Sequence, residues 1–194
     1  MNVYDFDNTI YSGDSSIDFY FYCLRKYPAV ITCLPRQIKA ALDYKLGRIE
    51  KVIFKEAFFS FLNKLHDPKK DVGEFWDKNQ SKMNSWYLRQ QEEDDLIVSA
   101  SPVFLLRDIC TRLNIKYLIA SEVNIRTGRF ESDNCYGKEK VKRVMESFPD
   151  AKINKFYSDS LSDKYLAELS KEAFMVAENT ISKWPVDNNG GQKK

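Results

Sequence analysis

The sequence lacks long apolar runs, paired cysteines and all but one histidine. No stretch of about 18 consecutive apolar residues occurs, which excludes a helix that spans a membrane. The 4 cysteines, Cys23, Cys33, Cys110 and Cys135, form no Cys-x-x-Cys pair, and this spacing favours a reducing compartment. The start has neither a basic region nor an apolar stretch that ends in small residues, so we expect no secretion signal. We therefore expect a cytoplasmic protein, and we assign no chemistry to the single histidine, His66.

Charge is nearly balanced overall but unevenly spread. The net charge is +2, from 30 Lys and Arg against 28 Asp and Glu. Between Arg25 and Lys55, however, eight basic residues accompany only two acidic ones. Such an excess attracts anions. Its simplest interpretation is a solvated surface. The alternative is contact with anionic lipid headgroups, because the apolar segment 29–34 is flanked by basic residues, as in interfacial helices.

The order of the expected elements predicts an α/β fold. Short apolar segments typical of buried strands lie at 2–6, 96–99, 116–120, 154–157 and 173–176. Helical periodicity follows the second, third and fourth of them, and 123–130 has the pattern of a hairpin that turns at Thr127 and Gly128. Strands that alternate with helices imply a Rossmann-like, mostly parallel sheet flanked by helices, with right-handed crossovers.

The long segment between the first two strands has a different pattern. Residues 14–90 show helical spacing throughout, interrupted by proline and glycine, and we expect them to form a small all-helical cap. Its aromatic clusters are expected in a core rather than in an acyl-chain pocket. The expected organisation is a catalytic core at 1–13 and 91–186, the cap at 14–90 and a disordered tail at 187–194.

Polar residues stand at the ends of three expected strands. In open parallel sheets, ligands bind outside the carboxyl ends of the strands. The first strand ends at Asp5, the second at Ser99 and the fourth near Asp159. A further contribution comes from Lys138 or Lys140, at the start of a helix. We therefore expect these side chains to meet at one edge of the sheet.

Together these residues resemble the four motifs of the haloacid dehalogenase superfamily, over residues 2–184. In order, the motifs are Asp5-Phe6-Asp7-Asn8-Thr9, Ser99 after an apolar strand, the lysines of Gly137-Lys138-Glu139-Lys140-Val141, and Asp159 with Asp163. The helical insertion directly after the first motif is similar to the cap of the phosphoserine phosphatase-like subgroup of small bacterial phosphatases.

The resemblance implies a phosphoric monoester hydrolase that works through an aspartyl-phosphate. Asp5 would be the nucleophile and Asp7 the general acid and base. A phosphate monoester carries about two negative charges, which a cation must neutralise before a carboxylate can attack. Mg²⁺ prefers hard oxygen ligands, and we expect Asp5, the backbone carbonyl of Asp7 and Asp159 to bind it, with Asp163 as ligand or support.

Ser99, one lysine and the backbone N–H groups near Asn8 and Ala100 would bind the phosphoryl oxygens. The alternative role for Ser99 is to cap the helix that Pro102 opens, although Ser101 is the better cap. Two lysines compete because residues two apart on a helix point to nearly opposite sides. Helical phase favours Lys138, whereas similarity to bacterial relatives favours Lys140, so both are kept.

The substrate is less defined than the reaction. Asp14 stands where phosphoserine phosphatases carry the acidic cap residue that binds the substrate amino group. Serines replace glycines around Ala100 and Asp159, and these departures argue against phosphoserine. We expect a phosphorylated small molecule or a phospholipid headgroup of the phosphatidylglycerophosphate type. The alternatives are phosphoryl transfer between sugar positions, or a non-catalytic module that binds the inner face of the membrane through its basic cap. We expect neither a nucleic-acid nor a protein partner.

Overall fold

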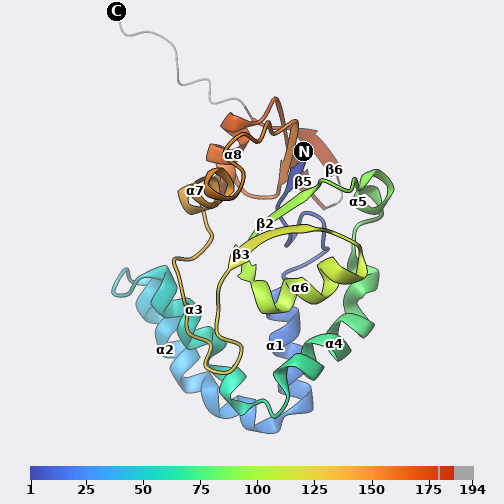
Figure 1. Ribbon diagram of the computed structural model, residues 1–194. Coiled ribbons are helices and arrows are strands. Elements are labelled where there is room, and N and C mark those ends of the chain that lie inside the picture. Colours follow the sequence, from blue (N-terminus) through green and yellow to red (C-terminus); the bar gives the residue numbers. More distant parts are fainter. Residues whose placement is uncertain (179, 186–194) are drawn as a thin grey trace, which may run out of the picture.

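The computed structural model describes residues 1–178 and 180–185 (Figure 1). Six strands form one sheet in the order β3-β2-β1-β4-β5-β6. They are β1 (Val3–Tyr4), β2 (Leu96–Pro102), β3 (Tyr117–Ser121), β4 (Lys155–Ser158), β5 (Glu172–Ala177) and β6 (Thr180–Lys183). All neighbouring pairs are parallel except β5 with β6, so the predicted α/β fold with a mostly parallel sheet is confirmed. The tail predicted at 187–194 lies outside the described residues.

Every regular element between β1 and β2 is a helix. These are α1 (Ser15–Lys26), η1 (Pro28–Cys33), α2 (Leu34–Lys45), α3 (Lys51–Phe59), η2 (Ser60–Lys64), α4 (Pro68–Asn79), η3 (Gln80–Lys82) and α5 (Ser85–Gln90). The remaining helices are α6 (Val103–Arg112), α7 (Lys138–Ser147), η4 (Leu161–Asp163) and α8 (Lys164–Leu169). None of the described helices is both long enough and apolar enough to cross a bilayer. The division of the chain into a core and a cap stays a prediction.

The sheet is covered on both faces, which explains why its central strands read as continuous apolar runs. Alternate residues of a strand point to opposite faces. Val3 and Phe156 accordingly pack with residues of α7 and α8. Tyr4 and Tyr157 belong to the larger core on the other face, which α6 and most of the helical insertion share. The insertion therefore packs against the sheet through the protein's main hydrophobic core.

Helices α1 to α4 of the insertion form the end of the molecule opposite α7 and α8, whereas α5 lies beside the sheet (Figure 1). The first helix of the insertion starts where Asp14 accepts the N–H of Ile17 at 3.0 Å, which satisfies one of the free donors of the first turn. The aromatic residues of the insertion mainly fill its interior: Phe19 and Phe61 are buried, as expected for core residues. Phe58 and Phe59 of the same clusters instead line a pocket.

The hairpin predicted at 123–130 reaches across to the insertion. Val123 and Phe130 form an antiparallel bridge. Gly128 has φ +73°, and a Cβ there would lie 2.4 Å from the carbonyl oxygen of Phe59. Only glycine accommodates both this backbone angle and this approach. The hairpin thus fixes the end of α3 relative to the sheet.

Candidate active site

A pocket of about 340 Å³ opens at the carboxyl ends of β1, β2 and β4. All the predicted site residues except Lys138 line it: Asp5, Asp7, Asn8, Asp14, Ser99, Ala100, Lys140, Asp159 and Asp163. Asp5 and Asp159 directly follow β1 and β4, and the backbone N–H of Asp5 donates to the carbonyl of Tyr157 at 2.9 Å. Ser99 lies where the pairing of β2 with β3 shifts register, an irregularity that redirects side chains.

Lys140 is the positive centre of the pocket. Its Nζ donates to Asp5 Oδ1 at 2.8 Å and to Asp163 Oδ2 at 2.6 Å, and only 3% of its side chain is exposed. Burial alone would lower the pKa of Lys140, but the charges of Asp5 and Asp163 outweigh it and raise that pKa. Burial raises the pKa of Asp5 to about 7, although the charge of Lys140 acts in the opposite direction.

Lys138 lies elsewhere. It begins α7 directly after Gly137, and its Nζ is 5.2 Å from the centroid of the Tyr165 ring. Since residues two apart on a helix face different ways, the helix that buries Lys140 in the pocket turns Lys138 out of it. The structure thus brings Lys140, and not Lys138, to the carboxylates.

Asp7 has a separate set of partners. Its Oδ1 accepts the backbone N–H of Ser15 at 2.7 Å, and its Oδ2 accepts the hydroxyl of Ser101. Burial raises the pKa of Asp7 to about 6, the charge of Asp14 adds to this, and the hydrogen bonds from Ser101 and Ser15 act in the opposite direction. A carboxyl with a pKa close to neutral can both donate and accept a proton at physiological pH.

The expectation that Ser101 caps a helix is wrong. Strand β2 continues through Pro102, and α6 begins at Val103 without a side-chain cap. The hydroxyl of Ser101 instead binds Asp7, with Ser16 Oγ 3.1 Å away. Neither does Ser99 cap α6: its hydroxyl accepts the N–H of Ser101 at 3.1 Å.

The loop after β1 is tightly organised. Asn8 has φ 53°, and its N–H donates to the carbonyl of Gly13 at 2.9 Å, which closes the loop. Thr9 Oγ1 accepts the N–H of Asp159 at 3.0 Å and so ties this loop to the end of β4. Asp14 lines the pocket while capping α1. The backbone N–H of Asn8 is therefore engaged within the loop.

The donor set of the pocket fits a divalent cation. Lys140 pairs with Asp5 and Asp163, whereas Asp7 and Asp159 have no ion pair within 1–178 and 180–185. Asp163 Oδ1 is buried, and no described residue forms a hydrogen bond with it. Burial raises the pKa of Asp159, as does the charge of Asp163. Excess negative charge on hard oxygen atoms is the environment that Mg²⁺ prefers.

Another group of acidic residues, closer together than those of the pocket, lies at the amino end of β2, away from the pocket. Glu92, Asp94 and Asp95 precede β2, and their carboxylate oxygens lie within 4.8 Å of one another. Two of the three are exposed, and Asp95 already accepts N–H groups from Asn2 and Glu92. Such a group forms a polar turn without an ion. The carboxylate oxygens of Asp5, Asp7 and Asp159 do not all lie within 4.8 Å of one another. The expected Mg²⁺ site does not require this, because it uses the side chains of Asp5 and Asp159 but only the backbone carbonyl of Asp7.

Two lysines of α3, Lys51 and Lys55, line the pocket. From the sequence we expected them in a solvated surface segment. Lys55 Nζ donates to the carbonyl of Ala100 and to Asn134 Oδ1, both at 2.9 Å. Burial lowers the pKa of Lys55 to about 8, and the charge of Lys51 adds to the effect. Lys51 Nζ lies 3.2 Å from the centroid of the Tyr136 ring. Their spacing of four places both on one helix face, but the sequence did not indicate which face meets the pocket.

The remaining wall of the pocket is apolar and belongs to the insertion. It consists of Ile17, Phe54, Phe58 and Phe59. The pocket therefore combines a polar floor from the strand ends with a partly aromatic side from the helices.

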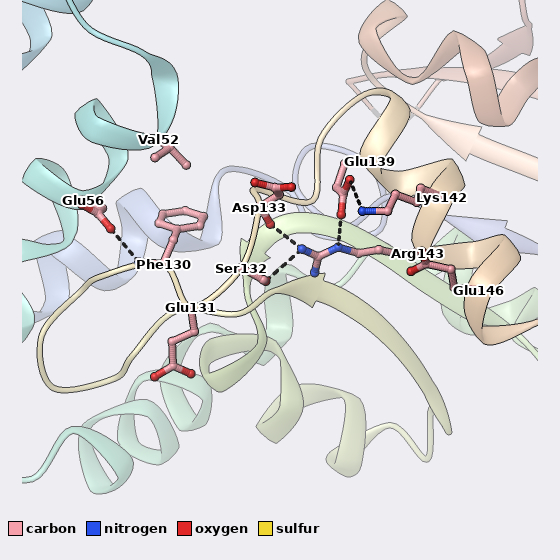
Figure 2. A pocket seen from close by; sticks show the side chains of 10 residues that line it. All are labelled: Val52, Glu56, Phe130, Glu131, Ser132, Asp133, Glu139, Lys142, Arg143 and Glu146. Carbon is pink, nitrogen blue, oxygen red and sulfur yellow. Dashed lines mark hydrogen bonds and ion pairs between the residues drawn. The ribbon is translucent and has the colours of Figure 1, made fainter.

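A larger cavity, of about 730 Å³, lies between α3, α7 and the hairpin (Figure 2). Figure 2 shows Arg143 extending from α7 to the loop that follows the hairpin, where it donates to Ser132 Oγ at 3.0 Å and to the Asp133 carbonyl. Across the cavity, Glu56 of α3 accepts the N–H of Phe130 at 2.9 Å. None of the predicted site residues lines this cavity. Its side chains hold the hairpin between the two helices.

Comparisons with known proteins concern the family and the fold of the chain. A family model for the haloacid dehalogenase-like hydrolases matches residues 3–168. No curated protein matches the chain. A protein of unknown function from Bordetella pertussis Tohama I is similar in structure, with a TM-score of 0.72 and 21% identity over 89% of this chain and 87% of that one.

Two further solved structures share the fold. A phosphoserine phosphohydrolase-like protein from Francisella tularensis subsp. tularensis SCHU S4 has a TM-score of 0.53 and 18% identity, over 89% of this chain and 86% of that one. A probable phosphoserine phosphatase from Vibrio cholerae has a TM-score of 0.63 and 10% identity, over 89% of this chain and 55% of that one. At these identities the likeness concerns the fold alone.

Proposed function

The chain belongs to the haloacid dehalogenase-like hydrolases, and from this premise we propose that it is a magnesium-dependent phosphatase that hydrolyses a phosphomonoester through an aspartyl-phosphate. One observation carries the proposal. A single loop presents two carboxyls to the same pocket: Asp5 is buried and paired with Lys140, whereas Asp7 is half-buried and has no ion pair in the described chain. These are the separate environments that a nucleophile and a general acid require.

Asp5 supplies the attacking oxygen. Its carboxylate forms a bond to phosphorus as the bond to the ester oxygen breaks, and the product is an acyl phosphate on Asp5. Lys140 holds Asp5 in place through the 2.8 Å hydrogen bond and adds positive charge beside the phosphoryl oxygens. Ser99 and backbone N–H groups near Ala100 complete the phosphate site.

Asp7 moves the proton in both halves of the reaction. It donates a proton to the departing alkoxide, which leaves as an alcohol. It then accepts a proton from the water that attacks phosphorus, so that inorganic phosphate is released and Asp5 is restored. The pKa of about 6 suits both steps at neutral pH. Ser101 and Ser15 fix the orientation of the carboxyl throughout.

Magnesium would be held by Asp5, the carbonyl of Asp7 and Asp159, with Asp163 as ligand or support, and when bound it neutralises the phosphoryl oxygens. Within the described residues Asp159 has no ion pair and Asp163 Oδ1 has no hydrogen-bond partner, and both observations support this assignment.

The substrate we propose has a phosphate next to a partly apolar group. The apolar wall formed by Ile17, Phe54 and Phe58 favours such a molecule over a fully polar one. Either a phosphorylated small molecule or a phospholipid headgroup meets this description. A screen of both classes with the wild-type chain distinguishes them by kcat/KM, and analysis of the products separates hydrolysis from phosphoryl transfer between sugar positions.

The reaction is tested with p-nitrophenyl phosphate, with and without Mg²⁺. We expect Mg²⁺-dependent turnover that Asp5→Asn abolishes and that Asp7→Asn lowers by about 100-fold or more. Denatured samples quenched during turnover are then weighed by intact mass spectrometry. A phosphoryl group should be found on the wild type and on Asp7→Asn but not on Asp5→Asn. Turnover that survives Asp5→Asn would disprove the proposal.

A further inference from the structure

The outward face of α2 is apolar. The helix packs on its neighbours through Gln37, which accepts the Tyr20 hydroxyl and donates to the Phe58 carbonyl, both at 2.9 Å. The stripe on the opposite side consists of Ile38 and Leu42, both 56% exposed, and continues to Leu46, which directly follows the helix and is 62% exposed. A surface helix of a soluble domain normally places polar residues there. Here the apolar stripe has no partner within the described chain.

Positive charge surrounds this stripe. Arg36 and Lys45 are exposed and form no ion pair with any described residue. Lys39 and Arg48 share a single acidic partner, Asp43, at 2.5 Å and 3.5 Å, so this trio retains one positive charge. Part of the basic segment noted in the sequence is thus arranged around an exposed apolar stripe.

We propose that α2 docks on an anionic membrane surface, with its axis parallel to the bilayer. In this arrangement Ile38, Leu42 and Leu46 enter the headgroup region, and the surrounding Arg and Lys side chains contact lipid phosphates. The apolar stripe and the basic residues around it then both have a binding partner, because a bilayer with anionic lipids has apolar chains beneath negatively charged headgroups.

A second copy of the chain is a poorer occupant. Two copies that meet through α2 would bring Arg36, Lys39 and Lys45 close to the same basic residues of the other copy, and like charges across an interface oppose association. None of the polar residues that line the active-site pocket belongs to this docking face. The inference therefore stands apart from the proposed phosphatase activity, and Asp5→Asn should bind vesicles as the wild type does.

Vesicle co-sedimentation tests the proposal. The wild-type chain is mixed with vesicles of phosphatidylcholine, with and without phosphatidylglycerol, at low and high salt. We expect binding to the anionic vesicles alone, weakened by salt. Removing one basic residue near a membrane surface costs about fivefold in affinity, so Arg36→Gln with Lys45→Gln should weaken binding about 25-fold. The triple variant Ile38→Gln, Leu42→Gln, Leu46→Gln should weaken it at least about tenfold.

Matched variants elsewhere on the surface serve as controls. Leu88 and Leu169 are 44% and 49% exposed and lie far from α2 in the chain, so Leu88→Gln with Leu169→Gln should leave binding unchanged. Thermal unfolding verifies that each variant is folded. A wild type that remains in the supernatant with anionic vesicles at low salt would overturn the proposal. So would binding that the triple variant leaves intact, or a dimer in sedimentation velocity that the triple variant abolishes.

Discussion

Replacement of Lys140 by methionine removes the only cation that contacts Asp5 within the part of the chain that the structure describes. Met keeps the length of the side chain and much of its volume, so the change acts mainly on charge and hydrogen bonding. Two carboxylates lose a donor at once, because Nζ is 2.8 Å from Asp5 and 2.6 Å from Asp163. Lys138→Met, two residues away on the same helix, is the matched control.

The magnitude follows from burial. Lys140 is 3% exposed and Asp163 2% exposed, so water cannot replace the lost charge. Breaking a buried ion pair by removing one partner costs about 3 to 5 kcal/mol of folding free energy. We expect a loss of this size at about pH 9, where folding of the variant buries the ionised carboxylates of Asp5 and Asp163 without the lysine.

The loss should shrink as pH falls. Burial raises the pKa of Asp5 to about 7 even with Lys140 present, and removing that lysine raises it further. A carboxyl with a raised pKa stabilises the folded chain when protonated, and this stability is lost as pH rises through the folded-state pKa. Between about pH 9 and pH 7 the free energy of unfolding of the variant should therefore rise by ~1.4 kcal/mol per pH unit for each proton that is bound in the folded state but not in the unfolded state.

Urea unfolding followed by tryptophan fluorescence, in EDTA at both pH values, measures these free energies. Activity is measured in parallel with p-nitrophenyl phosphate, where Lys140→Met should lower kcat by about 100-fold or more. Lys138→Met should retain both stability and activity. Equal effects of the two substitutions, or a loss below about 1 kcal/mol at pH 9 for Lys140→Met, would refute the reasoning.

Four further predictions concern the pocket and the hairpin. In EDTA, thermal stability should fall as pH rises from about 5 to 8, because burial raises the pKa of Asp7 to about 6 and that of Asp5 to about 7. Mg²⁺ should raise the melting temperature more at the higher pH, where protons no longer compete, and an equal effect at both would contradict the assigned site. Ser101→Ala should move the acidic limb of the kcat profile to higher pH, since the hydrogen bond that lowers the pKa of Asp7 is lost, whereas Ser160→Ala should not. Gly128→Ala should cost about 2 to 4 kcal/mol in urea unfolding, because its Cβ would collide with the Phe59 carbonyl in a backbone region that favours glycine. Gly47, also at positive φ but with nothing within 4 Å, should tolerate alanine better, and equal losses would refute the contact.

The order of strands and helices could be predicted because the central strands are buried on both sides. Residues such as Val3 and Ile97 face different layers, yet both layers are apolar, so the strands read as unbroken hydrophobic segments. Strand β6 was missed for the opposite reason. All its residues are exposed, and it joins the sheet as an antiparallel edge through backbone hydrogen bonds that leave no hydrophobic pattern.

The fold class was almost enough to predict that Asp5, Ser99 and Asp159 lie close together. Parallel strands end at the same edge, so residues about 90 and 150 positions apart meet by topology alone. The choice between Lys138 and Lys140 depended on where α7 begins and how it packs, which a shift of one residue would reverse. Ser101 looked like a helix cap because Pro102 follows it, but β2 continues to Pro102 and carries the hydroxyl to Asp7.

The sequence by itself determined the kind of fold and the chemistry of its strand ends, since apolar periodicity and residue type are local properties. Only the tertiary structure decided what the helical insertion contributes. Lys55 reaches the Ala100 carbonyl across 45 positions of chain, and the outward direction of Ile38 and Leu42 depends on which side of α2 Gln37 fastens to its neighbours. Amphipathic spacing identifies a helix face, whereas packing against other elements decides whether that face meets a pocket, a core or the surroundings.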